Sequence, residues 1–311
     1  MATHVIAEAA APPATREHIR ALGLATMWQA IRGNRKALAG LALFVLFAFL
    51  AAFPGLVAHD PPSAEIYQPS VAPSLDHLLG TTSYGQDIFA QLVYGTRESL
   101  IIALVVGIAA TLISVVIGVS AAYLGGKADG ALSLFTDVFL VIPQFPLAVV
   151  IAAYARSGGI LMLLVVLIVT SWSFGARQLR AQAQSLRNRD FLEAARVRGE
   201  TRRYIILFEM LPTMTSLIVA NFLGTALYAV LTAAGLQFVG LGDVNSLSWG
   251  TMLYWAQNNE ALQAGIPLWA LAPGICIALL GAAFALLNYA FDEISNPALR
   301  PARRLRGRVA G

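Results

Sequence analysis

The chain has 311 residues, of which 58% are hydrophobic and only 12% are charged, and its mean hydropathy is +0.68. A soluble domain has roughly 45 to 50% apolar and about 25% charged residues, so this composition excludes an ordinary soluble protein and predicts an integral membrane protein. The formal net charge of +4 does not indicate nucleic-acid binding, because the arginines cluster beside apolar runs. The one cysteine, Cys276, excludes an internal disulfide and a zinc cluster.

The amino-terminal segment, residues 1–37, precedes the first apolar run and is predicted to be a cytoplasmic tail. Its stretch "REHIRALGLATMWQAIRGNRK" mixes apolar and basic residues, as does an amphipathic helix that lies along the inner membrane surface. The alternative is a loosely ordered basic tail that only fixes the topology.

Six apolar runs are long enough to cross a bilayer, since about 20 residues rising about 1.5 Å each span a hydrocarbon core of about 30 Å. The first exceeds the roughly 7 to 15 residues of a signal-peptide core and is predicted to remain as an anchor. Pro143 and Pro146 predict a kink in the third. The predicted fold class is therefore all-α, with six transmembrane helices. The spans are residues 38–58, 99–124, 131–155, 159–176, 212–239 and 266–291.

Basic residues set the predicted orientation. Of the 21 lysines and arginines, 19 lie on one side of the spans, and only Arg97 and Arg156 lie on the other. The positive-inside rule therefore places both termini and the loop 177–211 in the cytoplasm. The transmembrane domain would cover residues 38–296, followed by a basic cytoplasmic tail, 297–311. Two larger loops, residues 59–97 and 240–265, would lie outside.

The spans contain almost none of the chemistry that powers transport. Asp137 is their one charged residue, and all four histidines lie outside them, whereas an ion-coupled carrier places charged groups within its spans. The sequence lacks a Walker A motif, and the spans hold no pairing of a nucleophile with a base or of metal ligands. We therefore expect no catalytic site, metal or bound cofactor in this chain, and expect its energy to come from another subunit.

The stretch "DFLEAARVRGETRRYIILFEMLP", residues 190–212, is unusually charged for this chain. Asp190 at the N-cap with Glu193 at N3 would begin a helix, and Ala194 and Ala195 would keep one face small for a partner. Gly199 suits the left-handed turn that ends a helix. A second amphipathic stretch, 202–210, completes a predicted helix, turn and helix that docks a cytoplasmic subunit. The alternative is a solvated basic loop that only enforces topology.

Several ordered motifs carry a resemblance to a known family. "EAARVRG" followed by Leu211 and Pro212 resembles the EAA loop of binding-protein-dependent ABC importer permeases. "HLLGTTSYGQDIFAQLVYGTRESL", "GLQFVGLG" with "SWGTML", and "PLWALAPG" are similar to stretches of the second permease subunit of the dipeptide, oligopeptide, nickel and opine branch. The similarity runs from about residue 28 to 300 and implies the type I ABC importer permease fold.

The resemblance implies a role for the charged loop. Its helix and turn would seat in a cytoplasmic ATPase, and closure of an ATPase pair, which would hold ATP and Mg, would drive the spans. Arg196 and Arg198 would either form ion pairs with the ATPase or anchor the loop at the inner face. The implied coupling residues are Asp190, Glu193, Ala194, Ala195, Arg196, Arg198, Gly199, Leu211 and Pro212.

The resemblance also implies the partners and the place of the protein. A companion permease would supply half of the pathway, and an extracytoplasmic solute-binding protein would deliver the ligand. The chain would lie in a bacterial-type plasma (inner) membrane. Di- or oligopeptides are the expected substrate, with oligosaccharides, nickel or opines as alternatives. Outside the family, a stand-alone secondary carrier or a structural scaffold is the alternative.

The chain departs from the family pattern at several positions. Thr82 stands where the family usually has Asp, Gln86 where it has Arg, Arg198 where Leu is common and Glu209 where His is frequent. These departures put the substrate, rather than the coupling loop, in doubt.

Polar residues within the spans allow two interpretations. They could line the pathway, or they could hydrogen-bond between helices, and pairing within the bundle is favoured for the aspartate. These residues are Asp137, Asn221, Gln237 and Asn288.

Overall fold

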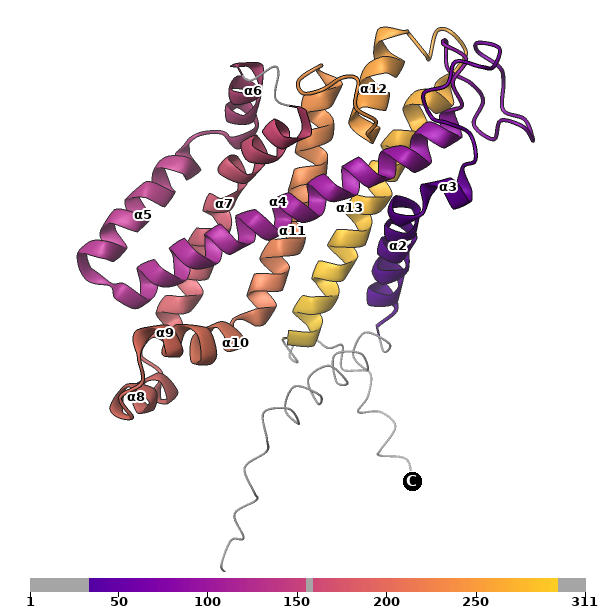
Figure 1. The fold of residues 1–311 in the computed structure, drawn as a ribbon. Helices are drawn as coiled ribbons and strands as arrows, with labels where there is room; N and C mark the ends of the chain where they lie inside the picture. The colour runs from indigo at the N-terminus through magenta and orange to yellow at the C-terminus, as the bar shows by residue number, and fades with distance from the viewer. Residues whose placement is uncertain (1–33, 155–158, 296–311) are drawn as a thin grey trace, which may run out of the picture.

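The computed structural model describes residues 34–154 and 159–295, which are mostly helical (Figure 1). Within them, five helices are long and apolar enough to cross a membrane, or six if the bent pair α5 and α6 forms one span. The all-α membrane fold with up to six spans is thus confirmed. The elements are α2 (Arg35–Ala52), α3 (Pro54–Val57), α4 (Ile88–Leu124), α5 (Gly126–Val141), α6 (Gln144–Tyr154), α7 (Gly159–Leu186), α8 (Asp190–Val197), α9 (Arg202–Tyr204), the π-helix η1 (Ile205–Met210), α10 (Leu211–Thr213), α11 (Thr215–Phe238), α12 (Trp249–Asn258) and α13 (Pro267–Ser295).

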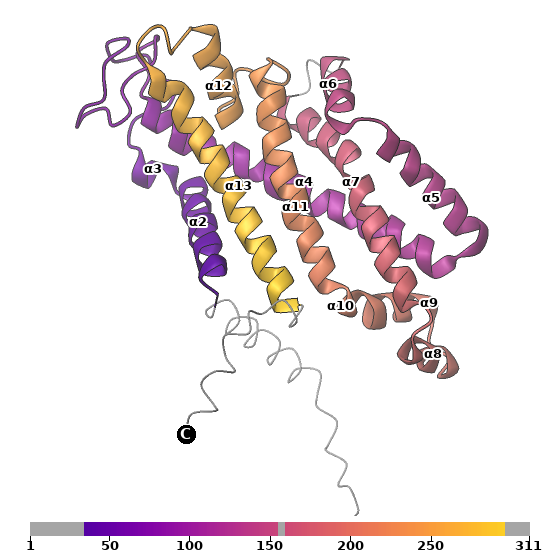
Figure 2. The same cartoon turned by 180° about the vertical axis from the view of Figure 1, so that it is seen from behind.

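The long helix α4 holds the bundle together. It crosses α7, α11 and α13 diagonally, in front of them in Figure 1 and behind them in Figure 2. Close approach to α7 requires a small residue, since a Cβ on Gly118 would overlap the main chain at Ala176. Ser114 also donates a hydrogen bond to the Trp172 carbonyl oxygen (2.6 Å). Small and hydroxyl residues of this kind drive helix packing where water is absent.

Several helices begin or end away from the predicted spans. The helix α4 begins at Ile88 rather than near residue 99, because the Asp87 side chain accepts a hydrogen bond from the Ala90 N–H (2.7 Å) and caps it. Arg97 and Glu98 therefore lie within α4 and not in a loop. The first span breaks at Phe53, because Pro54 starts the separate helix α3.

The third predicted span is bent. The chain bends by 82° between helices α5 and α6, and Pro143 lies at the break, directly before the start of α6. The predicted kink is confirmed, and it separates two helices where the sequence suggested one continuous run.

The loop predicted for residues 177–211 is shorter than expected. The helix α7 continues through Leu186, and the last part of the loop forms α9, η1 and α10. The next span, α11, begins at Thr215 rather than at Pro212, which lies in α10. The sequence misses these extensions because polar residues can continue a helix beyond the apolar core.

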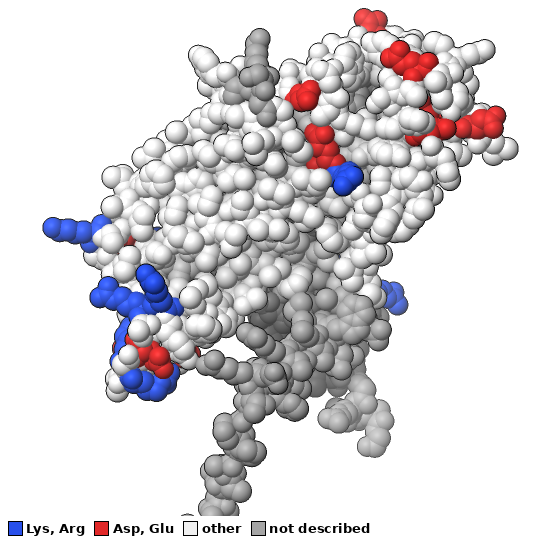
Figure 3. Space-filling view, in the orientation of Figure 1, with Lys and Arg blue, Asp and Glu red and all other residues white. Residues whose placement is uncertain are grey.

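Charge separates the two ends of the molecule (Figure 3). Basic residues gather at the end that carries α8, and acidic residues gather at the end that carries α12, with an uncharged band between them. We call these the α8 end and the α12 end. The interfacial helix predicted within residues 1–37, the tail 297–311 and Arg156 lie outside the described residues, apart from residues 34–37. The side that each end faces, and the division into tails and a membrane domain, stay predictions.

Candidate functional site

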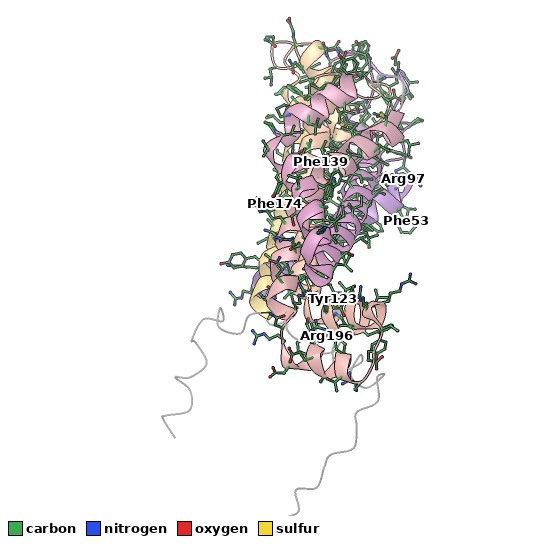
Figure 4. The ribbon with its side chains drawn as sticks, turned by 90° about the vertical axis from the view of Figure 1, so that its left-hand side faces the viewer. Phe53, Arg97, Tyr123, Phe139, Phe174 and Arg196 are labelled. Carbon is green, nitrogen blue, oxygen red and sulfur yellow. The ribbon has the colours of Figure 1, made fainter. Side chains whose placement is uncertain are left out.

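The short helix α8 stands at the tip of the α8 end, below the ends of α4 and α7 (Figure 4). Leu192 and Ala195 on its inner face are fully buried. They pack in a cluster with residues of α4, α7 and η1, including Val119, Leu179 and Ile205. Burying a leucine side chain contributes about 2 kcal/mol, so α8 is held on an apolar base.

The start of α8 differs from the prediction. Arg189 is the N-cap residue and its side chain makes no capping hydrogen bond, whereas Asp190 is the first residue of the helix. The predicted capping box is therefore wrong. Asp190 and Glu193 both lie in the first turn, where carboxylates are stabilised by the N-terminal end of the helix dipole.

The end of α8 agrees with the prediction. Gly199 has φ +79°, in the left-handed region that favours glycine. The Gly199 N–H donates to the Arg196 carbonyl oxygen (2.9 Å), and the Glu200 N–H donates to the Ala195 carbonyl oxygen (3.2 Å). These two bonds form a Schellman motif, which fixes the direction of the chain after α8.

One face of α8 is exposed, and we call it the exposed stripe. It consists of Asp190, Glu193, Ala194 and Val197, whose spacing places them along one side of a helix. Val197 is 88% exposed although it is apolar. The pair of alanines predicted to face a partner is divided, because Ala195 points into the bundle. Sequence reasoning missed Val197, which its spacing from Glu193 and Ala194 could have indicated.

Arg196 and Arg198 both make contacts within the chain. Arg196 donates a hydrogen bond to the Arg187 carbonyl oxygen (2.9 Å) and its guanidinium lies 5.8 Å from the Tyr123 ring centroid (Figure 4). Arg198 pairs with Glu209 at 3.3 Å. Two of the departures from the family pattern thus contact each other. These contacts anchor α8 to the rest of the α8 end.

Leu211 and Pro212 lie beyond the π-helix. Leu211 packs against the same apolar cluster as Leu192, and its N–H bonds to the Ile206 carbonyl oxygen across a π-helical turn. Pro212 sits in the first turn of α10, where its missing N–H costs no helical hydrogen bond. Together they join the α8 region to α11.

A polar cavity of about 450 Å³ lies beside α7 and α11. Asn221 and Asn288, two of the four predicted polar residues, both line it. Its other polar lining residues include Gln144, Ser171, Gln178, Thr225 and Tyr228. We call it the α7–α11 cavity. Its walls present amide and hydroxyl groups, which both donate and accept hydrogen bonds.

The two asparagines differ in their bonding. The Asn221 amide donates to the Thr111 hydroxyl of α4 (3.3 Å), and a Cβ on Gly175 would overlap it. The buried Oδ1 of Asn288 finds no hydrogen-bond partner among the described residues. Asn221 thus serves helix packing as well as the cavity wall, while Asn288 keeps an acceptor free.

Gln237 lies elsewhere, at the α12 end. Its amide donates to Glu98 Oε1 (3.2 Å) and accepts from the Ser248 hydroxyl (2.8 Å), and Ser246 also donates to Glu98 Oε1 (2.9 Å). This polar network joins α4, α11 and the segment before α12. Sequence reasoning missed Glu98, because the helix was predicted to begin after it.

Asp137 forms a weak pair with Arg177 at 3.8 Å, and both side chains are more than half exposed. The contact is with α7 but lies at the surface, so pairing of Asp137 within the bundle stays a prediction. A stronger pair lies about two turns of α5 away, where Arg180 contacts Asp129 through two hydrogen bonds of 2.6 and 2.8 Å. The two pairs tie α5 to α7.

The loop before α4 is held by its own polar contacts. The buried Thr82 hydroxyl accepts from the main-chain N–H groups of Tyr84 and Gln86 (both 3.2 Å). Tyr67 donates to Asp60 (2.8 Å), and this bond, followed by burial and the Asp60 charge, raises the pKa of the Tyr67 phenol. Side-chain hydrogen bonds therefore hold the loop before α4 in a defined conformation.

Residues 114–301 match the family described as the inner membrane component of binding-protein-dependent transport systems. This chain belongs to that family. It is accordingly a multi-pass inner membrane protein and a component of a transport system. The matched region includes α8, the exposed stripe and the α7–α11 cavity.

Relatives and a solved structure agree with this assignment. The chain is 30% identical to the oligopeptide transport system permease protein OppC of Mycobacterium tuberculosis over 274 residues, 87% of this chain and 93% of the relative. It is 29% identical to the dipeptide permease DppC of Bacillus subtilis, covering 88% of this chain and 85% of the relative. The MetNI methionine ABC transporter in inward-facing conformations matches with a TM-score of 0.52 and 22% identity, over 68% of this chain and 97% of that one. That likeness shows the ABC permease fold.

Proposed function

We propose that this chain is a permease subunit of an ATP-driven importer and forms half of a pathway for di- or oligopeptides. A companion permease would supply the other half. Two cytoplasmic ATPase domains would bind ATP and Mg and dock at α8, and an extracytoplasmic solute-binding protein would deliver the peptide. The α8 end would then face the cytoplasm, with both termini on that side.

The observation that carries the proposal is the two-sided character of α8. Its inner face is fully buried against α4, α7 and η1, while its exposed stripe projects outward. A partner that pushes on Glu193, Ala194 or Val197 would therefore move α4 and α7 with α8, because a packed apolar cluster transmits displacement. An element that couples an ATPase to the membrane helices has to transmit motion in this way.

The α7–α11 cavity supports a peptide substrate. Its amide and hydroxyl groups match the alternating donors and acceptors of a peptide main chain, whatever the side chains of the peptide are. The relatives in Mycobacterium tuberculosis and Bacillus subtilis carry the names of oligopeptide and dipeptide permeases. Asn288, with its unpaired acceptor, would accept a hydrogen bond from a peptide N–H.

The coupling proposal is tested by Glu193→Arg in the transporter reconstituted with its companion subunits. We expect the complex to assemble but peptide uptake per ATP hydrolysed to fall at least about tenfold, because the new charge opposes an interface that accepted an acid. Gln182→Arg, which adds the same charge to an exposed position on α7, is the matched control. Unchanged coupling in an assembled Glu193→Arg complex would contradict the proposal.

The substrate is tested separately, by mass spectrometry of the ligand that purifies with the cognate solute-binding protein. We expect short peptides. Recovery of sugars, an opine or nickel would overturn the substrate while leaving the coupling proposal standing.

A further inference from the structure

A second cavity lies at the α12 end. Helix α12 is at the opposite end of the molecule from α8 (Figure 1). The cavity has a volume of about 370 Å³, within the range of about 300 to 1,000 Å³ typical of ligand pockets. Its floor is buried and its rim, which includes Glu65 and Asn245, is exposed. We call it the α12 cavity, and the residues that matter in it are Glu65, Tyr84, Gln86, Gln91, Trp255 and Trp269.

The floor of the α12 cavity carries an unused donor. Trp269 is only 1% exposed, yet its indole N–H finds no hydrogen-bond acceptor among the described residues. The neighbouring Trp255 N–H, by contrast, donates to the Val244 carbonyl oxygen (2.9 Å). Buried donors are normally paired, so an occupant that brings an acceptor such as a carbonyl oxygen would complete the site.

The rim carries an acid without a cation. The Gln91 amide donates to Gln86 Oε1 (2.6 Å), and the Gln86 amide donates to Glu65 Oε1 (3.5 Å). Within the described part of the chain, no basic side chain lies within ion-pair distance of Glu65. The carboxylate is thus oriented by an amide relay and left open to a positively charged group.

Aromatic rings line the same cavity as this acid and this donor. The Tyr84 ring contacts Trp255 and Trp269 edge-on, at centroid distances of 6.1 and 6.4 Å. Aromatic rings accommodate the apolar stem of a long basic side chain and attract its cation. The three features together suit an extended segment with a lysine or arginine.

The surface around the α12 cavity favours the same class of occupant. Among residues 59–98 and 240–266, all of them described, seven are acidic and Arg97 is the one lysine or arginine. Figure 3 shows the acidic residues gathered at this end. Such a field attracts a basic surface and speeds its association. The acidic residues are Asp60, Glu65, Asp76, Asp87, Glu98, Asp243 and Glu260.

We propose that the α12 cavity receives one lysine or arginine side chain from the solute-binding protein. The cation bonds Glu65, the stem lies along Tyr84 and Trp255, and a main-chain carbonyl next to the basic residue accepts the Trp269 N–H. The residues of the cavity support the binding of a lysine or arginine side chain, while the identity of the partner rests on the proposed function. The bound side chain thereby fixes the position of the docked partner against the outer ends of α4 and α13.

The chemistry is tested on the full chain in lipid nanodiscs, titrated with N-acetyl-lysine methylamide while tryptophan fluorescence is followed. N-acetyl-norleucine methylamide, which has no charge, is the matched probe. We expect the lysine probe alone to bind, with a dissociation constant on the order of millimolar, and Glu65→Gln and Trp269→Phe each to weaken it about tenfold. Asp76→Asn, an exposed acid outside the cavity, should leave binding unchanged. Equal binding of the two probes, or binding that both cavity variants leave unchanged, overturns the proposal.

The partner is tested in the assembled transporter by stimulation of ATP hydrolysis with the loaded solute-binding protein. Glu65→Gln and Trp269→Phe should raise the half-stimulating concentration about tenfold at low salt and leave basal hydrolysis unchanged, whereas Asp76→Asn should have little effect. An unchanged concentration in both cavity variants overturns the assignment of the occupant. If the unaltered transporter shows no stimulation at all, the proposed function fails and the partner with it, while the probe titration reports on the chemistry of the cavity independently.

Discussion

The α8 end and the α12 end hold segments outside the membrane helices in opposite ways. At the α8 end, α8 rests on an apolar cluster and is closed by main-chain hydrogen bonds at Gly199. At the α12 end, side chains distant in sequence form a polar network, in which Glu98 binds Gln237 and Ser246. A packed apolar base moves together with the helix that rests on it, whereas a hydrogen-bond network between distant side chains holds one geometry. The α8 end is therefore suited to transmit motion, and the α12 end is suited to keep a fixed conformation.

Trp249 shows how tightly the α12 end is tied to the bundle. It is fully buried, its indole N–H donates to the Leu92 carbonyl oxygen (3.0 Å), and its ring lies edge-on to Phe47 at 5.3 Å. Its main-chain N–H also bonds the Ser99 hydroxyl (3.2 Å). Helix α12 is therefore fixed to α2 and α4, while α8 contacts the bundle mainly through apolar side chains.

The largest expected effect is at the apolar base. Leu192→Asp should detach α8, because burying an unpaired carboxylate where a leucine packed costs about 3 kcal/mol or more. Trypsin cleavage within residues 189–203 should become at least about a hundredfold faster. Val197→Asp, the same change on the exposed stripe, is the control and should cleave at the parental rate. A protease-resistant Leu192→Asp chain would mean that apolar packing does not hold α8.

The next largest effect is in the polar network. Glu98→Ala leaves the Gln237 amide and the Ser246 hydroxyl without their acceptor, at a cost of about 2 kcal/mol. We expect a lower thermal midpoint in detergent, and expect Asp76→Ala, an exposed acid at the same end, to be near neutral. If Glu98→Ala costs as much in a Gln237→Leu background as in the parental chain, Glu98 acts through contacts other than its bond to Gln237.

A smaller effect is expected at the turn after α8. Gly199→Ala should cost about 1 kcal/mol, because φ is +79° while the space around the position is open, so only backbone strain opposes the methyl group. Hydrogen exchange at the Glu200 N–H should speed up accordingly. Gly130→Ala is the matched control, since that glycine is helical, also has open space and lacks a positive φ. Equal effects of the two changes would rule out strain at Gly199.

The smallest effect is expected for the exposed pair Arg198 and Glu209. A double-mutant cycle with Arg198→Leu and Glu209→Ala, read by the thermal midpoint in detergent, should give a coupling of about 0.5 kcal/mol that disappears at high salt. A coupling several times larger, or one insensitive to salt, would mean that α8 is held by charge and not by its apolar face.

The α8 end was easier to predict than the α12 end, because its determinants are local. Gly199 indicated the turn, and the small and charged residues around Glu193 indicated the helix. The N-cap was assigned one residue late, since Asp190 is a good capping residue but Arg189 has the extended backbone that the position requires. Helix boundaries are set by such backbone details, which composition does not report.

The α12 end depended on contacts between distant residues. Gln237 was recognised as polar within a span, but its partner Glu98 lies 139 positions away, and nothing local joins them. Asn221 and Asn288 were recognised in the same way, yet only the packing of α11 against α13 brings both to one cavity. The sequence pattern identifies an isolated polar side chain, but the residue that it contacts is known only from the tertiary structure.

The sequence by itself determined the membrane class, the number of apolar runs, the segregation of charge and the turn at Gly199, because each follows from composition or from a few adjacent residues. Only the tertiary structure decided which face of α8 is free, the division between Ala194 and Ala195, the Glu98 network and the α12 cavity with its unpaired Trp269 N–H. The reason is physical: burial and pairing depend on what lies opposite a residue in space, and in this bundle that neighbour is on another helix.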